Sequence, residues 1–317
     1  MVRWPVQAPG AVLEPVNAAH APAGNAAPVG ATGQARPELL AGLAVRALIE
    51  EAELTPKPAL VDRRGGGAHN DMDLGMLRRS AHALRPTFRA LAARARGRAP
   101  DQRLREELAA IGRRGEETMF AVTDGVNTHR GAIWTLGLLT AAAAMAPPDT
   151  GPVRIAAIAG QVAAFPDRYA PSEMSHGSLV AQRYGVPGAR GEARSGFPHV
   201  VGVALPALRA ARAAGHPEQL ARLDALVALI AHVDDTCLLY RGGRAALRDA
   251  QARARAVLAD GGSANVAGRR ALQLLEASLL RQRASPGGSA DLLAAALFLD
   301  NFDHTAANGG GAPLEVA

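Results

Sequence analysis

The chain contains a single lysine, Lys57, although lysine and arginine together number 35. It lies in residues 55–73, TPKPALVDRRGGGAHNDMD, where prolines, glycines, a histidine and aspartates surround it. An ammonium group is a compact charge with a tunable pKa, whereas guanidinium is a planar fork that stays charged. The segment predicts a phosphate cradle with a carboxylate offered to Mg²⁺ or to a substrate hydroxyl. Two alternatives remain open: Lys57 is a chance surface residue, or the segment is a polar turn in which Asp71 caps the next helix.

A second cluster, residues 116–131, combines a metal ligand, hydrogen-bond donors and a phosphate fork within one helix junction. Its sequence is EETMFAVTDGVNTHRG, which brings Glu116, Asn127, Thr128, His129 and Arg130 close together along the chain. The alternative is that Asn127 or Thr128 caps the next helix and that His129 is a core histidine with satisfied hydrogen bonds. The concentration of these residue types in one turn favours a binding site.

A third cluster, residues 232–243, carries two adjacent acids after an apolar helix. Asp234 and Asp235 follow a segment, LVALIAHV, that reads as buried, and Arg241 comes shortly afterwards. Carboxylates at the C-terminal end of a helix oppose its macrodipole, so their charge calls for a cation. A divalent metal is the interpretation we favour, and a pair of surface acids is the alternative.

A fourth cluster opens the last helix with Ser285, Pro286, Gly287 and Gly288. The serine is expected to cap, the proline to stiffen the loop, and the glycines to let backbone approach a ligand. Residues 175–177 and 190–198, the second of which contains Glu192, are weaker candidates of the same kind.

The elements between these clusters read as helices, because apolar residues recur at spacings of three and four and no period-two strand appears. The expected helices are 38–53, 72–94, 102–121, 130–146, 153–164, 173–184, 200–214, 217–234, 244–259, 265–283 and 288–301. A hydrophobic content of 48% with 3% aromatics suits closely packed helices. We therefore expect an all-α fold: a disordered leader (1–36), a single compact multi-helix bundle as catalytic domain (37–304), and a frayed, flexible tail (305–317).

The composition limits the classes of binding partner that are expected. A formal charge of +6 favours anionic partners, but arginines scattered among acids without an aromatic-interleaved stripe argue against nucleic acid. The most apolar segment, 132–147, is shorter than the roughly 20 residues that span a bilayer, so no membrane association is expected. The only cysteine, Cys237, cannot form an intramolecular disulfide, and the leader lacks the pattern of a secretory signal, so a cytoplasmic protein is expected.

Together, the clusters resemble the triphosphoribosyl-dephospho-coenzyme A synthases, which serve citrate lyase and malonate decarboxylase. The resemblance covers about residues 38–303 and is most specific at TPKP (55–58), GVNTHRG (125–131), DDT (234–236) and SPGG (285–288). The segments ALVDRR (59–64), GAIW (131–134) and DTC (235–237) look most like the malonate decarboxylase branch.

The resemblance implies that ATP gives its triphosphoribosyl group to the ribose 2′-hydroxyl of 3′-dephospho-CoA and that adenine leaves. The product would be the precursor of the prosthetic group of the malonate decarboxylase acyl carrier protein. ATP and 3′-dephospho-CoA are then the small-molecule substrates, and a homodimer is compatible with the sequence. An oxocarbenium-like centre needs a base for the hydroxyl, an acid for adenine and cations on the triphosphate.

Within that scheme, Asp71 is expected to be the general base, His129 an acid or orienting group, and Lys57 a third catalytic residue. The expected Mg²⁺ ligands are Glu116, Asp234 and Asp235. The expected nucleotide-binding residues are Lys57, Arg63, Gly65, Gly66, Gly67, His69, Asn127, Thr128, Arg130, Glu192, Arg241, Ser285, Gly287 and Gly288.

Two other functions are compatible with the residues alone. One is a Mg²⁺-dependent hydrolase of an N-glycosidic or phosphoester bond, in which water replaces the 2′-hydroxyl. The other is a non-enzymatic helical binding module for the decarboxylase complex, although a scaffold has no need to concentrate acids and glycines at helix junctions.

Overall fold

The structure, a computed structural model, describes residues 32–172 and 175–307. This part of the chain is all-α, as predicted, and its only β-type pairing is an isolated bridge between Asp62 and Gly65. The helices, in chain order, are α1 (Thr32–Glu53), α2 (Leu74–Ala83), α3 (Arg85–Ala95), α4 (Gln102–Val122), α5 (Arg130–Met145), α6 (Pro152–Ala164), α7 (His176–Tyr184), α8 (Gly188–Arg194), the π-helix η1 (Val200–Ala204), α9 (Leu205–Ala213), α10 (Glu218–His232), α11 (Thr236–Ala259), α12 (Val266–Arg281) and α13 (Gly287–Ala307).

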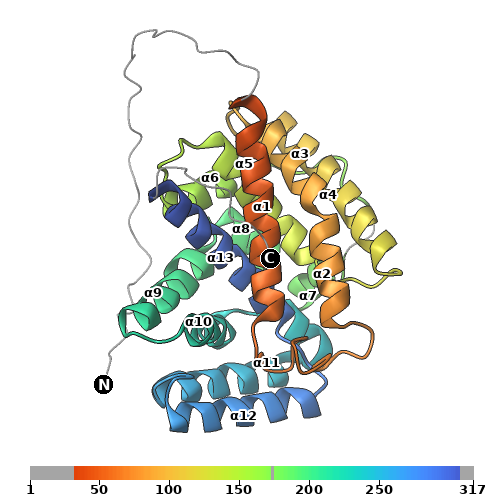
Figure 1. The fold of residues 1–317 in the computed structure, drawn as a ribbon. Coiled ribbons are helices and arrows are strands. Elements are labelled where there is room, and N and C mark those ends of the chain that lie inside the picture. Colours follow the sequence, from red (N-terminus) through yellow and green to blue (C-terminus); the bar gives the residue numbers. More distant parts are fainter. Residues whose placement is uncertain (1–31, 173–174, 308–317) are drawn as a thin grey trace.

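The central helices α1, α5 and α13 pack on one another and contribute many of the core residues. Helix α5 is buried almost all round, from Ala132 to Ala144, which is why its sequence shows no polar face. The surrounding helices cover this centre, while α11 and α12 lie side by side across one end of it (Figure 1). The main hydrophobic core contains residues from Leu40 to Phe302, and Ala52, Val61 and Leu77 form a small second cluster.

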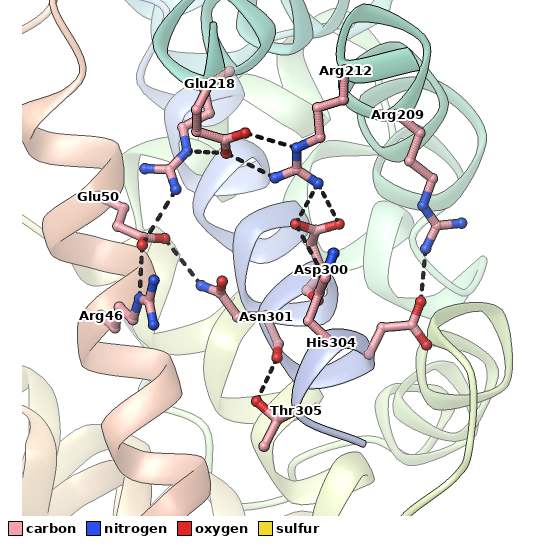
Figure 2. A network of polar contacts seen from close by, with 11 residues as sticks. Arg46, Glu50, Arg209, Arg212, Glu218, Asp300, Asn301, His304 and Thr305 are labelled. Atoms are coloured by element: carbon pink, nitrogen blue, oxygen red, sulfur yellow. Dashed lines mark hydrogen bonds and ion pairs between the residues drawn. The ribbon is translucent and has the colours of Figure 1, made fainter. Parts of the chain in front are cut away.

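A polar network holds the far end of α13 in place (Figure 2). The Arg212 guanidinium of α9 donates to both carboxylate oxygens of Asp300 at 2.9 and 2.8 Å and to Glu218 of α10. Asn301 donates to Glu50 of α1 at 3.0 Å. These contacts fix α13 against α1, α9 and α10, so the opposite end of α13, which carries the fourth cluster, has a defined position.

Several helix boundaries differ from the predictions. The segment 72–94 is two helices that meet at Leu84, because Pro86 has no N–H to continue the hydrogen-bond ladder. Helix α11 begins before the predicted 244 and kinks at Gly243, where φ is +63°. Helix α8 and the π-helical start of 200–214 were not predicted.

The predicted leader and tail fall mostly outside the described residues, but the predictions for 32–36 and 305–307 are wrong because both stretches are helical. Helix α1 starts early because Arg36 donates to the carbonyls of Ala143 and Ala146, at 2.7 Å each, and so caps the end of α5. No helix in the described ranges is long and apolar enough to cross a bilayer.

Candidate active site

The four clusters meet at one cavity of about 990 Å³. It lies between the end of α1, one face of α4, the start of α5, the α7–α8 region, the α10–α11 junction and the start of α13. The predicted site residues that line it are Lys57, His69, Asp71, Glu116, Asn127, Thr128, His129, Arg130, Glu192, Asp234, Asp235, Arg241, Ser285, Gly287 and Gly288. Segments more than 200 residues apart in sequence therefore share one site.

Residues 63–67 of the predicted phosphate cradle lie outside the cavity. Arg63 is exposed and pairs with Glu53 at 2.6 Å, outside the cavity. Gly66 and Gly67 allow a tight turn, since a Cβ on them would lie 2.4 Å from the His69 carbonyl and 2.5 Å from the Leu60 carbonyl. Gly65 closes the turn through its backbone bridge to Asp62, as described above. These glycines shape the loop and do not face the cavity.

Lys57, in contrast, is buried at the cavity wall, so the alternative of a chance surface lysine is wrong. Its side chain is 1% exposed, and its Nζ donates to Oε1 of Glu51 at 2.7 Å. The Lys57 backbone N–H donates to Asp62 at 2.9 Å, which fixes the loop at this point. Glu51, at the end of α1, also lines the cavity and was not predicted.

His129 is buried beside this pair. Its Nδ1 lies 2.8 Å from the Ser80 hydroxyl, which also contacts Thr128 at 2.8 Å. Its Nε2 is buried without a hydrogen-bond partner. Burial, assisted by the charge of Lys57, lowers the pKa of His129 to about 4. The imidazole is therefore neutral near pH 7, which suits a hydrogen-bonding or orienting group better than a charged acid.

Asp291, a cavity carboxyl that was assigned no role from the sequence, lies near the start of α13. A Cβ on Gly131 would lie 2.0 Å from the Asp291 Oδ2, so only glycine lets this carboxyl approach the start of α5. Burial first, then the charges of Glu51 and Asp235, raise the pKa of Asp291 well above its ordinary value, while the Ala132 N–H acts in the opposite direction. The available signal was an acid at the start of an otherwise apolar helix.

Asp235, predicted to be a metal ligand, caps two helices in the structure. Its carboxylate accepts the N–H groups of Cys237 at 2.8 Å and Leu238 at 3.4 Å, at the start of α11. It also accepts Gly288 N–H at 3.3 Å and the N–H and hydroxyl of Ser289 at 2.8 and 2.9 Å, at the start of α13. Two helix N-termini, not a cation, balance this charge.

The same geometry corrects the role of the glycines in the fourth cluster. A Cβ on Gly288 would lie 3.1 Å from Asp235, and one on Gly287 would lie 3.0 Å from the Cys237 sulfur. The glycines thus admit the carboxylate and the thiol of this chain. Because Asp235 occupies the Gly288 amide, that amide is not free for phosphate.

The three predicted metal ligands do not form a preformed metal site. Within the described ranges, no group of three or more His, Cys, Asp or Glu side chains is placed to hold an ion. Glu116 pairs with Arg130 at 2.9 Å, and Asp235 is saturated as described. Asp234 alone is exposed and free of hydrogen bonds and ion pairs within the described ranges. The set does not fit a dedicated magnesium site.

A polar group at the mouth of the cavity joins the first, third and fourth clusters. His69 contacts the Ser285 hydroxyl through Nε2 at 2.8 Å, and Arg241 reaches its Nδ1 at 3.3 Å. Asp71 lies 3.5 Å from the same Nδ1. Asp73, whose side chain accepts the Met76 N–H, caps α2. The alternative that gave Asp71 this capping role is therefore wrong, and Asp71 stays available to a ligand.

Two predicted binding residues have structural partners. Glu192 is buried, and its carboxylate accepts the N–H of His199 at 2.9 Å and contacts its Nδ1 at 2.7 Å. Asn127 accepts the Arg130 N–H at 3.2 Å, which is the capping alternative named above. Both still line the cavity.

Comparisons with known proteins identify the family of this chain. The family model described as "CitG: ATP:dephospho-CoA triphosphoribosyl transferase" matches residues 37–309. A probable 2-(5''-triphosphoribosyl)-3'-dephosphocoenzyme-A synthase of Azotobacter vinelandii is 57% identical over 84% of this chain and 92% of its own. Proteins of the same description from Pseudomonas fluorescens and Pseudomonas paraeruginosa are each 56% identical, over 84% and 87% of this chain and 92% and 94% of theirs. No solved structure matches.

Proposed function

Because this chain belongs to the ATP:dephospho-CoA triphosphoribosyl transferase family, we propose that the cavity is the active site for that transfer. The observation that carries the proposal is the convergence of all four motif clusters on one cavity of about 990 Å³. This volume is at the upper end of the range for small-molecule sites, as two nucleotides require. The buried Lys57–Glu51 pair, His129 and Asp291 form the polar part of its wall.

The reaction balances within this chain's residues. The bond from C1 of the ATP ribose to adenine N9 breaks, and a bond to the 2′-oxygen of dephospho-CoA forms. Asp71, beside His69, takes the proton of the attacking hydroxyl, and the protonated Asp291 gives one to the departing adenine. The raised pKa of Asp291 supports the role of acid, because burial and the neighbouring carboxylates favour its protonated form.

Lys57 and His129 act as positioning groups in this scheme. Lys57 is held by Glu51 with little freedom, and His129 lines the cavity with an Nε2 that has no hydrogen-bond partner among the described residues. Magnesium remains a prediction, and it would enter bound to the phosphates of ATP, because Mg²⁺ commonly takes only one or two protein carboxylates. No step above passes through the ion.

The test is to incubate the protein with ATP, with and without 3′-dephospho-CoA, and to follow adenine by chromatography and the product by mass spectrometry. Transfer predicts adenine only when the acceptor is present, with one equivalent of the triphosphoribosyl adduct. Equal adenine release without the acceptor would instead support the hydrolase. Absence of turnover in a folded, nucleotide-binding protein would support a binding module.

We also propose that the product serves the malonate decarboxylase acyl carrier protein and that the enzyme acts in the cytoplasm. The support is the likeness of residues 59–64, 131–134 and 235–237 to that branch. Deleting the gene in its host and weighing the carrier protein by mass spectrometry tests this. A malonate decarboxylase carrier that keeps its full prosthetic-group mass after deletion would contradict it.

A further inference from the structure

One wall of the cavity carries arginines to which the sequence analysis gave no role. The residues of α4 that face the cavity are Arg105, Leu108, Ala109, Gly112, Arg113 and Glu116. Their spacing of three and one places them along a single stripe of the helix. Arg190 of α8 lines the same cavity. The α4 stripe and the start of α8 together bring arginines from two helices to the cavity.

Arg105 is a buried cation that makes no ion pair with the described residues. Its residue is 7% exposed, and its Nε is buried with no hydrogen-bond partner. The guanidinium carbon lies 5.0 Å from the centre of the Trp134 ring. Burial lowers the pKa of Arg105, and the charges of Arg190 and Arg113 act in the same direction, while Asp167 opposes them. Like charges thus face one another across this wall.

The remaining charges on this wall are already paired. Arg113 donates to Asp167 at 2.6 Å, and Glu116 is engaged by Arg130, as described above. Arg190 is exposed and makes no side-chain hydrogen bond or ion pair with the described residues. Two guanidinium groups, those of Arg105 and Arg190, are left without a carboxylate.

Trp134 connects these two arginines. Its indole N–H donates to the carbonyl of Ala189, the residue before Arg190, at 3.1 Å. Its ring supports the Arg105 guanidinium through a cation–π contact, which leaves the N–H edges of the fork available. The indole thereby holds the start of α8 and the Arg105 side chain in a fixed relation before any ligand arrives.

We propose that Arg105 and Arg190, supported by Trp134, form a subsite for the condensed phosphate chain of a nucleotide substrate. The identification of the ligand as a substrate rests on the proposed function, whereas the anion chemistry does not. Planar guanidinium groups bind phosphate oxygens through paired hydrogen bonds, and a chain of phosphates can satisfy both arginines at once. Both substrates carry condensed phosphate: a triphosphate in ATP and a diphosphate in dephospho-CoA.

The test measures binding of inorganic triphosphate to the full chain by calorimetry. Arg190→Gln alters an exposed residue, and Arg105→Met keeps most of the buried volume. Each substitution is expected to weaken binding by roughly 10- to 100-fold, since hydrogen bonds between charged partners are worth that much. The matched control is Arg154→Gln, because Arg154 is exposed, lies outside the cavity and makes no side-chain ion pair with the described residues. Circular dichroism verifies the fold of every variant.

Triphosphate binding that stays within twofold of the original in folded Arg190→Gln protein, or that falls equally in Arg154→Gln, overturns the subsite. Separate titrations with ATP and 3′-dephospho-CoA identify the source: the substrate whose affinity falls is the one whose phosphates lie here. If the variants lower the affinity for neither substrate, the proposal is also overturned. If the adenine-release assay fails while triphosphate binding depends on Arg190, the transfer reaction is wrong and the anion site stands. If transfer proceeds and Arg190→Gln changes no affinity, the subsite alone is wrong.

Discussion

Replacing Lys57 by methionine should be one of the most destabilising single substitutions in this chain. The Lys57 ammonium is 1% exposed and lies 2.7 Å from Glu51, whose side chain is 9% exposed. Methionine keeps much of the volume of the stem but removes the charge. Glu51 would then be an unpaired carboxylate in a buried position, and its charge already raises the pKa of the neighbouring Asp291.

The expected loss follows from the separation and burial of the two charges. At an effective dielectric constant of about 20, charges 2.7 Å apart attract by about 6 kcal/mol. Removing both ions from water costs free energy, which offsets part of that attraction. After the single substitution, Glu51 still loses its hydration but no longer gains the attraction of Lys57. Breaking a buried pair in this way costs about 3–5 kcal/mol, a large share of the roughly 5–15 kcal/mol that stabilises a typical protein.

Urea unfolding at constant m-value measures this loss. The double variant Lys57→Met/Glu51→Gln removes both charges and should recover at least about half of it. The matched control is Arg63→Met, which breaks the 2.6 Å pair with Glu53 at an exposed position and should cost less than about 1 kcal/mol. A free energy of unfolding of the Lys57→Met variant within about 0.5 kcal/mol of that of the original protein would refute the buried pair. Full transferase activity in the double variant would refute its role in the site.

Three further predictions concern other parts of the cavity. Asp235→Asn should lower the free energy of unfolding by about 1–3 kcal/mol, because an amide nitrogen would face the donors that now bind the carboxylate. Asp234→Asn should change it by under about 0.5 kcal/mol, and chemical denaturation of the two variants measures the difference. Because the pKa of His129 is about 4 in the folded protein against an ordinary 6.5, the unfolded chain binds the extra proton first as the pH falls. The protein should lose about 3 kcal/mol of stability between pH 6.5 and 4, and a His129→Gln variant should lose less over the same range. Gly131→Ala should lower kcat/KM by about 100-fold, because the new methyl group displaces the Asp291 carboxyl; an unchanged rate would mean that Asp291 does not take part.

The fold was largely predictable because helical periodicity records which face of each helix is buried. The apolar spacing in α4 and α10 gave their bounds to within two residues. The misses have causes that periodicity does not register. At α1, Arg36 contacts the end of α5, a partner more than 100 residues away in sequence. In α11, the non-helical backbone of Gly243 separates a first helical segment, which was not predicted, from the predicted one that starts at 244.

The sequence predicted most of the residues that line the site, but not the role of each residue. A carboxylate that follows an apolar helix reads the same whether it binds a metal or caps a neighbouring helix. Only the position of α13, more than 50 residues later, shows that Asp235 binds its N-terminus. Because the two segments are far apart in sequence, the sequence alone does not show that Asp235 and the start of α13 are in contact. For the same reason Glu51 and Arg105, each on a helix outside the recognised motifs, gave no signal of their own.

The geometry also explains why this one position holds lysine in a chain that otherwise uses arginine. Lys57 presents three donors on one nitrogen, and the carboxylate of Glu51 lies within hydrogen-bonding distance of it. A guanidinium at the same buried position would bring five N–H groups spread over a planar fork, and each buried donor without an acceptor costs about 1–3 kcal/mol. Exposed arginines do not meet this cost, since water satisfies their free N–H groups. Within the described residues, the half-buried Arg36 and the buried Arg105 each have a buried Nε without a partner, and at Arg105, which lines the cavity, a bound phosphate chain would supply the oxygen atoms that its guanidinium lacks.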